Sequence, residues 1–78
     1  MSENTRIFSG ISPSKELEVL AAAAKIGQRS FGIPAAEYSP AKLKESIRDR
    51  SLHILIRTSL YDACAAKDVA FSALILPD

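Results

Sequence analysis

The sequence predicts a small all-α domain that is built from three to four helices. Two Ser-Pro pairs, Ser12-Pro13 and Ser39-Pro40, signal helix starts, because serine caps a helix and proline fits its first turn. After each pair, apolar residues recur at the three- and four-residue spacing of a buried helix face. A chain of 78 residues, 47% of them hydrophobic, has the length and composition of one folded domain, which we assign to residues 1–78.

The segment over residues 5–11 precedes the first helix and places Ile7, Phe8 and Ile11 near a glycine. This pattern predicts either a short strand or an extended arm whose Phe8 ring lies on the core. A strand needs a second strand to pair with, and the sequence shows no clear partner for this one.

The first helix is expected to end before Gly32, because glycine readily adopts the left-handed conformation that ends helices. Glu16 and Glu18 suit the positive end of the helix dipole and are expected to face solvent. The alanine run at residues 21–24 has little bulk, so a second helix can approach closely there. Two adjacent stripes are candidates for the core, and they comprise Leu17, Leu20 and Ala24, and Val19, Ala23 and Ile26.

The second helix is predicted to run as one basic helix over residues 39–57. Leu43, Ile47 and Ile54 are expected to lie along one of its faces. The Gly and Pro content of residues 31–38 predicts a loop between the two helices, and the apolar side chains in that loop predict that it packs on the core.

The second half of the chain is ambiguous between helix and strand. Residues 52–56 alternate apolar side chains, as a strand does, but no turn residue separates them from the capped helix, which favours helix. Ser59 and Asp62 resemble a capping box, which predicts that a new helix begins near Ser59. The alternative fold is α+β, with strands at 52–57 and 69–76.

The composition argues against secreted and membrane-spanning classes of protein. The single cysteine, Cys64, cannot form an internal disulfide and fits a reducing compartment. Residues 1–4 are polar, with no apolar signal segment behind them. The uncharged stretch at residues 69–77 is far shorter than the ~20 residues of a spanning helix. We therefore expect a cytoplasmic protein that has no membrane partner.

Residue sets that carry enzyme chemistry are mostly absent. The three glycines are isolated and match no phosphate-binding spacing. One histidine and one cysteine cannot build a usual metal site. Cys64 and His53 are the one nucleophile-base combination, but Cys64 lies among alanines and is expected to be a packed core residue. We therefore expect no enzymatic activity, no metal and no cofactor.

The distribution of charge is uneven along the chain. The net charge is +1, yet five of the ten basic residues lie at positions 42–57, where only Glu45 and Asp49 offset them and the local charge is +3. A helix with this bias suits an acidic protein surface or the phosphates of a nucleic acid.

These features predict a non-enzymatic helical interaction protein, such as an adaptor, a small subunit or an inhibitor. The apolar content is high for so short a chain. This predicts that some apolar side chains lie on the surface and contact a larger protein or a second copy. The expected contact is an apolar surface with a basic rim. The apolar residues are Phe71, Leu74, Ile75 and Leu76, and the basic residues are Lys44, Arg48, Arg50 and Arg57.

The alternative function is that of a small dimeric DNA-binding regulator. It would use the basic helix 39–57, with Lys42, Lys44, Arg48 and Arg50 against the phosphates. This hypothesis predicts an affinity that falls steeply as the salt concentration rises.

Overall fold

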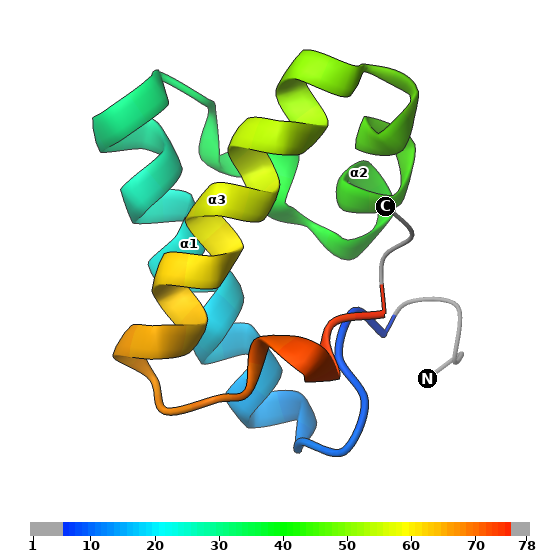
Figure 1. Cartoon of the computed structure of the whole chain (residues 1–78), viewed down its shortest axis with the longest axis vertical. Helices are drawn as coiled ribbons and strands as arrows, with labels where there is room; N and C mark the ends of the chain where they lie inside the picture. The colour runs from blue at the N-terminus through cyan, green and yellow to red at the C-terminus, as the bar shows by residue number, and fades with distance from the viewer. Residues whose placement is uncertain (1–5, 76–78) are drawn as a thin grey trace.

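The computed structural model describes residues 6–75 of the chain. This part of the chain is a small all-α bundle, as the sequence predicts (Figure 1). Helix α3 packs across α1, and the short segment η3 contacts both α2 and α3. In chain order the elements are α1 (Pro13–Phe31), the 3-10 helix η2 (Ala35–Tyr38), α2 (Pro40–Glu45), η3 (Ser46–Arg48), α3 (Arg50–Ala66) and η4 (Phe71–Ala73).

Both predicted ends of the first helix are confirmed. The Ser12 hydroxyl accepts a hydrogen bond from the backbone N–H of Lys15 at 3.1 Å, which caps the start of α1. Gly32 ends the helix with a φ of 68°, and its N–H donates to the carbonyl of Gln28 at 3.1 Å. The buried face of α1 carries Glu16, Val19, Leu20, Ala23 and Gly27.

The prediction for Leu17 is wrong, because this side chain points away from the core and is 65% exposed. The sequence offered two neighbouring stripes, and the buried face of α1 combines members of both. The helix is rotated so that Glu16, rather than Leu17, continues the buried row of Leu20 and Ala23.

The predicted continuous helix over residues 39–57 is wrong. Its start is confirmed, since Ser39 caps α2, but α2 ends at Glu45 and a turn of 3-10 helix follows. The Ser46 hydroxyl donates to the carbonyl of Leu43 at 2.6 Å. A side-chain hydrogen bond of this kind competes with the backbone hydrogen bonds of the helix, so serine can interrupt one. Asp49 is extended, and its carboxylate accepts from the N–H of Leu52 at 3.2 Å, so it caps a separate helix, α3.

Residues 52–56 are helical, as favoured from the sequence, and the alternative strand at 52–57 is wrong. The predicted new helix near Ser59 is also wrong, because α3 continues through this position to Ala66. The Ser59 hydroxyl donates to the carbonyl of Leu55 at 3.1 Å, which satisfies it inside the helix.

The two ends of the described chain lie side by side (Figure 1). The predicted strand at 5–11 is reduced to a single antiparallel bridge between Phe8 and Leu74, so the alternative strand at 69–76 does not form as such. The N–H of Ser9 donates to the carbonyl of Ala73 at 2.8 Å, and the N–H of Ile75 donates to the carbonyl of Ile7 at 2.9 Å. Positions 5 and 76 lie outside the described residues.

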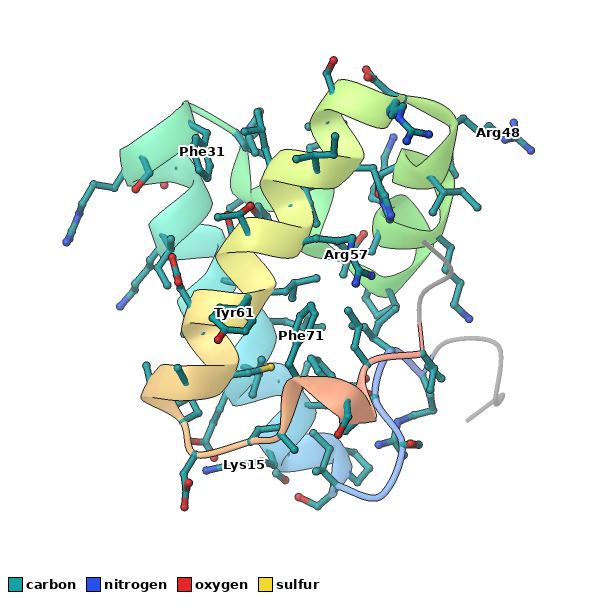
Figure 2. The ribbon with its side chains drawn as sticks, viewed as in Figure 1. Lys15, Phe31, Arg48, Arg57, Tyr61 and Phe71 are labelled. Carbon is teal, nitrogen blue, oxygen red and sulfur yellow. The ribbon has the colours of Figure 1, made fainter. Side chains whose placement is uncertain are left out.

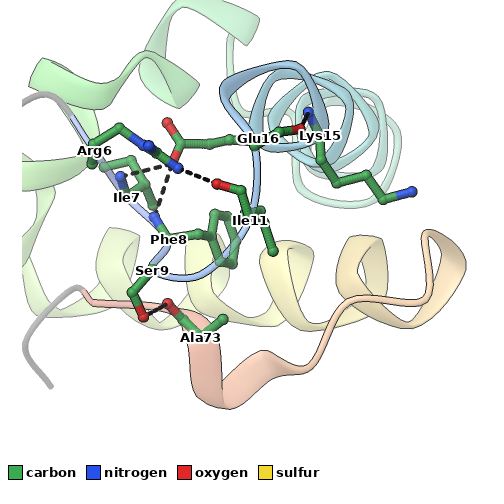
Figure 3. Close-up of polar contacts among 9 residues, drawn as sticks. Arg6, Ile7, Phe8, Ser9, Ile11, Lys15, Glu16 and Ala73 are labelled. Atoms are coloured by element: carbon green, nitrogen blue, oxygen red, sulfur yellow. Dashed lines mark hydrogen bonds and ion pairs between the residues drawn. The ribbon is translucent and has the colours of Figure 1, made fainter. Parts of the chain in front are cut away.

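The arm before α1 is fixed by the Glu16 carboxylate (Figure 3). One carboxylate oxygen accepts from the N–H groups of Ile7 and Phe8, at 3.1 and 2.9 Å, and from the Arg6 guanidinium at 3.1 Å. Ile7 and Phe8 are thereby held in the core, where both side chains are fully buried. The expectation that Glu16 faces solvent is wrong, because it satisfies backbone donors that no regular element would satisfy.

The core lies between α1 and α3 and is closed by the arm and by η2. Tyr38, at the end of η2, lies directly against Gly27 of α1, where any larger residue would overlap its hydroxyl group. Burial raises the pKa of the Tyr38 phenol, an effect that the nearby Ser59 hydroxyl partly opposes. The other buried apolar side chains include Val19, Leu20, Ala23, Ile33, Leu43, Ile56, Leu60, Ala63 and Cys64. Over residues 6–75, no helix has the length and apolar character needed to cross a lipid bilayer.

Candidate partner-binding surface

One side of α3 is turned away from the core and carries both apolar and basic residues. Four of its residues are spaced four, three and four positions apart, which places them in one row along the helix. They are Arg50, Ile54, Arg57 and Tyr61. Ile47 of η3 lies at one end of this row and Phe71 of η4 at the other. We call this set the α3 outer face, and it comprises Ile47, Arg50, Ile54, Arg57, Tyr61 and Phe71.

Three of the four apolar members of this face are open to solvent, and Phe71 is half-buried. Ile54 is 55% exposed, Tyr61 is 58% exposed and Ile47 is 41% exposed. Single exposed apolar residues are ordinary on protein surfaces, but neighbouring ones with a polar rim are typical of binding surfaces. Ile47 and Ile54 are neighbours in this sense, since both line the same surface hollow.

Aromatic and cationic groups fix the other end of the α3 outer face (Figure 2). The rings of Tyr61 and Phe71 meet edge to face, with their centroids 5.3 Å apart and an interplanar angle of 70°. The Arg57 guanidinium lies over the Phe71 ring, 5.2 Å from its centroid. The face is therefore held in shape by contacts between α3 and η4.

The hollow at the first end of the face has a volume of about 230 Å³. Its lining consists of Ile47, Arg50, His53, Ile54 and Arg57. His53 is the one buried member, with 6% of its surface exposed. Within residues 6–75, neither of its ring nitrogens has a hydrogen-bond partner.

The structure brings together only part of the predicted basic set. Arg50 and Arg57 both line the hollow. Arg48 is exposed and extends away from the helices (Figure 2). Lys44 is half-buried on α2 and does not line the hollow. The predicted rim is thus divided by the break in the helix, which turns α2 and α3 in different directions.

The described members of the predicted C-terminal contact are divided between the edge of the core and the surface. Phe71 and Leu74 are half-buried and pack against the core, while Ile75 is exposed. Leu76 lies outside the described residues. Of these residues, Phe71 alone belongs to the α3 outer face, through its contacts with Tyr61 and Arg57.

The sequence interpretation missed Ile47, Ile54 and Tyr61 as surface candidates. Ile47 and Ile54 were assigned to one face with Leu43, on the assumption of an unbroken helix. The row of Arg50, Ile54, Arg57 and Tyr61 was visible as a helical spacing, but its exposure depends on where α3 begins.

The nucleophile-base combination considered from the sequence is not assembled. Cys64 and His53 are eleven residues apart on α3, a separation of about 16 Å along the helix axis. Cys64 is buried, and burial raises the pKa of its thiol. Across residues 6–75, no group of three or more His, Cys, Asp or Glu side chains is arranged to hold a metal ion.

A second apolar surface lies between α1 and the segment around η2, and Leu17 is part of it. It is a groove of about 360 Å³ that is lined mainly by aliphatic and small side chains, with no charged residue among them. Its members are Leu17, Leu20, Ala21, Ala24, Ala35, Tyr38, Ser39 and Pro40. The groove has no feature that selects one kind of partner over another.

Comparison of the chain with protein-family models, with curated proteins and with solved structures finds no match in any of the three. The α3 outer face is therefore interpreted from its own residues alone.

Proposed function

We propose that this protein is a small helical interaction domain whose α3 outer face binds an acidic, apolar segment of a larger protein. The observation that carries the proposal is the combination of exposed Ile47 and Ile54 with two arginines around one hollow. Covering these isoleucines would contribute about 25 cal/mol for each Å² of apolar surface removed from water.

The charge of the face selects the chemistry of the partner. Arg50 and Arg57 stand on either side of Ile54 in the sequence of α3, so a bound segment meets positive charge next to its apolar contact. Acidic residues on the partner would increase the rate of association and exclude basic competitors.

A second copy of the chain fits this face less well than an acidic partner does. In a symmetric dimer the same patch lies on both sides of the interface, so the charges of Arg50 and Arg57 would occur twice in it, and the α3 outer face has no acidic residue to offset them. Like charges at such a contact oppose association.

The test is a selection of random peptides on the immobilised protein, followed by affinity measurements with two matched variants. Ile54→Asp places a carboxylate on the α3 outer face, whereas Leu17→Asp makes the same change at an exposed leucine on α1. We expect the selected peptides to combine acidic with bulky apolar residues. They should bind Leu17→Asp as well as the original chain, and bind Ile54→Asp at least about tenfold more weakly, a loss of about 1.4 kcal/mol.

Equal binding to the Ile54→Asp variant would contradict the proposal, provided that circular dichroism shows both variants folded. Loss of binding in the Leu17→Asp variant instead would move the contact to the groove on α1. A selection dominated by basic peptides would also contradict it, because the arginines would then oppose binding.

The DNA-binding alternative makes a different prediction, which is retardation of duplex DNA at low salt that disappears as salt is added. Two observations favour a protein partner over it. The basic residues of α2 do not line the hollow that contains Arg50 and Arg57, and the hollow is lined in part by Ile47 and Ile54, which offer nothing to a phosphate.

A further inference from the structure

Five exposed residues of α3 follow the spacing of a contact between two helices. They are spaced alternately three and four positions apart, so they form one straight stripe along the helix. In Figure 1, α3 crosses in front of α1, and within residues 6–75 no other element is drawn over this side of it. We call this stripe the α3 seam, and it comprises Ser51, Ile54, Thr58, Tyr61 and Ala65.

Large and small side chains alternate along the α3 seam. Ile54 and Tyr61 are each more than half exposed, and the positions between and beside them carry small side chains. The Thr58 hydroxyl donates to the carbonyl of Ile54 at 3.0 Å, so a partner that covers Thr58 leaves no unpaired hydroxyl group. When two helices pack lengthwise, the large side chains of each insert between residues of the other, and a stripe of alternating size leaves room for them.

The separation of the two large side chains distinguishes a helical partner from an extended one. Ile54 and Tyr61 are seven residues apart, which is about 10.5 Å along the axis of α3. In a partner helix, residues seven apart lie on one face with the same separation. In an extended segment, side chains on one face are about 6.6–7 Å apart, so they do not match this separation. An extended partner also gains no backbone hydrogen bonds, because the backbone groups within a helix are already paired.

The two flanks of the α3 seam carry opposite charges. Arg50 and Arg57 each precede a small residue of the seam and are seven positions apart, so they lie on the same flank. Asp62 follows Tyr61 and is exposed on the other flank. In a pair of helices, charged residues at such flanking positions determine which helix binds and how it is oriented. A helix with acidic residues toward the arginines and a basic residue toward Asp62 is therefore complementary in charge to this surface.

We infer that the partner segment is an amphipathic helix of about four turns that lies lengthwise along the α3 seam, with its acidic residues on the side of Arg50 and Arg57. The length follows from the seam, which runs from Ser51 to Ala65, about 21 Å along the helix axis. This inference rests on the proposed function and deepens it, since it states the conformation and the charge pattern of the bound segment. The acidic residues lie at the rim of the contact, where charged side chains keep access to water.

The test compares three synthetic peptides of about fifteen residues, the length of a four-turn helix. The heptad peptide has leucines spaced alternately three and four residues apart, with glutamates on one flank. The alternating peptide has the same composition, with its leucines at every second position. The proline peptide is the heptad peptide with proline at its centre, which breaks a helix. We expect fluorescence anisotropy to show that the heptad peptide binds at least about tenfold more tightly than the other two, and circular dichroism to show that it gains helix on binding.

A variant at the middle of the seam shows whether the peptide lies along its whole length or only in the hollow beside it. Thr58→Arg adds a long charged side chain on the seam, and Thr58 does not line the hollow. This variant should bind the heptad peptide at least about tenfold more weakly, because the peptide helix can no longer approach α3 closely. Gln28→Arg is the matched control, since it adds the same side chain at an exposed position of α1, and it should change the affinity by less than about twofold.

A charge reversal tests the assigned flank. Arg50→Glu should weaken binding of the heptad peptide at least about threefold, and it should strengthen binding of a peptide in which lysines replace the flanking glutamates. Arg48→Glu makes the same change at an exposed arginine outside α3, and it should change either affinity by less than about twofold. Circular dichroism checks that each variant is folded.

Tighter or equal binding of the alternating peptide or the proline peptide would overturn the inference, as would the absence of binding by the heptad peptide. Unchanged binding to Thr58→Arg, or equal effects of Arg48→Glu and Arg50→Glu, would overturn it as well. A dimer of the free chain in analytical ultracentrifugation that Thr58→Arg dissociates would place a second copy on the seam instead.

The two proposals fail in distinguishable ways. If the peptides selected from the random library lose affinity for Ile54→Asp but bind Thr58→Arg as well as the original chain, the α3 outer face binds proteins and the helical mode of binding is wrong. If the selected peptides bind Ile54→Asp and Leu17→Asp equally well, the proposed function itself is wrong.

Discussion

At the residue scale, Glu16 connects the arm before α1 to the helix that follows it. Its carboxylate accepts from two backbone N–H groups and from Arg6, so a segment with no regular structure of its own is held in place. Hydrogen bonds to a charged acceptor are worth more than those between neutral groups. Together with the backbone hydrogen bonds between residues 7–9 and 73–75, this side chain holds Ile7 and Phe8 in the core.

Glu16→Ala is expected to lower the free energy of unfolding by about 2–4 kcal/mol, because the N–H groups of Ile7 and Phe8 would be left buried and unpaired. Glu16→Gln keeps an acceptor oxygen and should cost about half as much. The control is Glu18→Ala, at an exposed position in the same helix turn, with a change within about 0.5 kcal/mol. Urea denaturation followed by circular dichroism measures all three, and equal effects of Glu16→Ala and Glu18→Ala would contradict the assigned role.

Tyr38 makes the stability of the protein sensitive to alkaline pH. Burial raises the pKa of its phenol, so the folded state keeps the proton to a higher pH than the unfolded state does. Stability is therefore complete below the ordinary tyrosine pKa of about 10 and declines as the pH rises above it. Tyr38→Phe should flatten this decline in denaturation curves recorded between about pH 8 and pH 11. Tyr61→Phe, at an exposed ring, is the control, and the two variants should not behave alike.

At the element scale, Gly27 decides how closely η2 approaches α1. The Tyr38 ring occupies the space that a side chain at this position would fill. Glycine within a helix normally costs about 0.5–1 kcal/mol relative to alanine, so its presence here reflects the contact rather than the helix.

Gly27→Ala is accordingly expected to lower stability, by about 1–3 kcal/mol for an overpacked core, although alanine is the better helix former. The control is Gln28→Ala, at the neighbouring exposed position of α1. Its free energy of unfolding should stay within about 0.5 kcal/mol of that of the original chain. Thermal denaturation shows whether the overpacking against Tyr38 or the better helix propensity of alanine has the larger effect. A Gly27→Ala variant as stable as the original would show that Tyr38 can move aside at no cost.

The sequence was informative where one residue type sets the local structure. The helix ends at Ser12, Ser39 and Gly32 were predicted correctly. A serine caps a helix through its own side chain and a glycine ends one through its own φ, so a single residue identifies each end. The break at residues 46–49 was not predicted. Serine and aspartate are tolerated inside helices as well as at their ends. Whether the helix breaks at these residues depends on tertiary packing, because Leu43 of α2 and the buried residues of α3 contribute to the same core.

The candidate site was harder to predict than the fold, because its exposure depends on the unpredicted break before α3. Arg50 and Arg57 were recognised as basic residues, but the isoleucines between and beside them were assigned to a buried face. Moving the start of α3 to Arg50 rotates Ile54 to the outside. The pairing of residues 7–9 with 73–75 lies beyond local patterns too, since it joins segments more than sixty residues apart.

At the scale of the whole molecule, the arm completes a core that three helices leave open. Phe8 is fully buried and bridges to Leu74, so the beginning and the end of the described chain are part of one cooperative unit. A domain of 78 residues has a free energy of unfolding of about 4–12 kcal/mol. The loss of a single large core side chain is therefore a large share of the total.

Phe8→Ala is expected to cost about 3–5 kcal/mol and to unfold a substantial fraction of the protein at physiological temperature. Phe31→Ala is the matched control, because this ring is partly exposed at the end of α1 and should cost less than half as much. Guanidinium denaturation compares them, and a small effect of Phe8→Ala would show that the arm is not required for folding.

The organisation of the molecule explains why α3 can present an apolar face to solvent. Its opposite side packs on α1 through Ile56, Leu60 and Ala63, which are fully buried, so the exposed Ile54 is not part of the core. An apolar residue outside the core is available for binding.

The most direct test of this account is an amide NMR map of the chain with and without a selected acidic peptide. The account predicts that the largest shifts fall on Ile47, Arg50, Ile54 and Tyr61, along the α3 outer face, while α1 around Leu17 remains unchanged. Shifts centred on the groove of α1, or spread evenly over the surface, would contradict the assignment of α3 as the binding face.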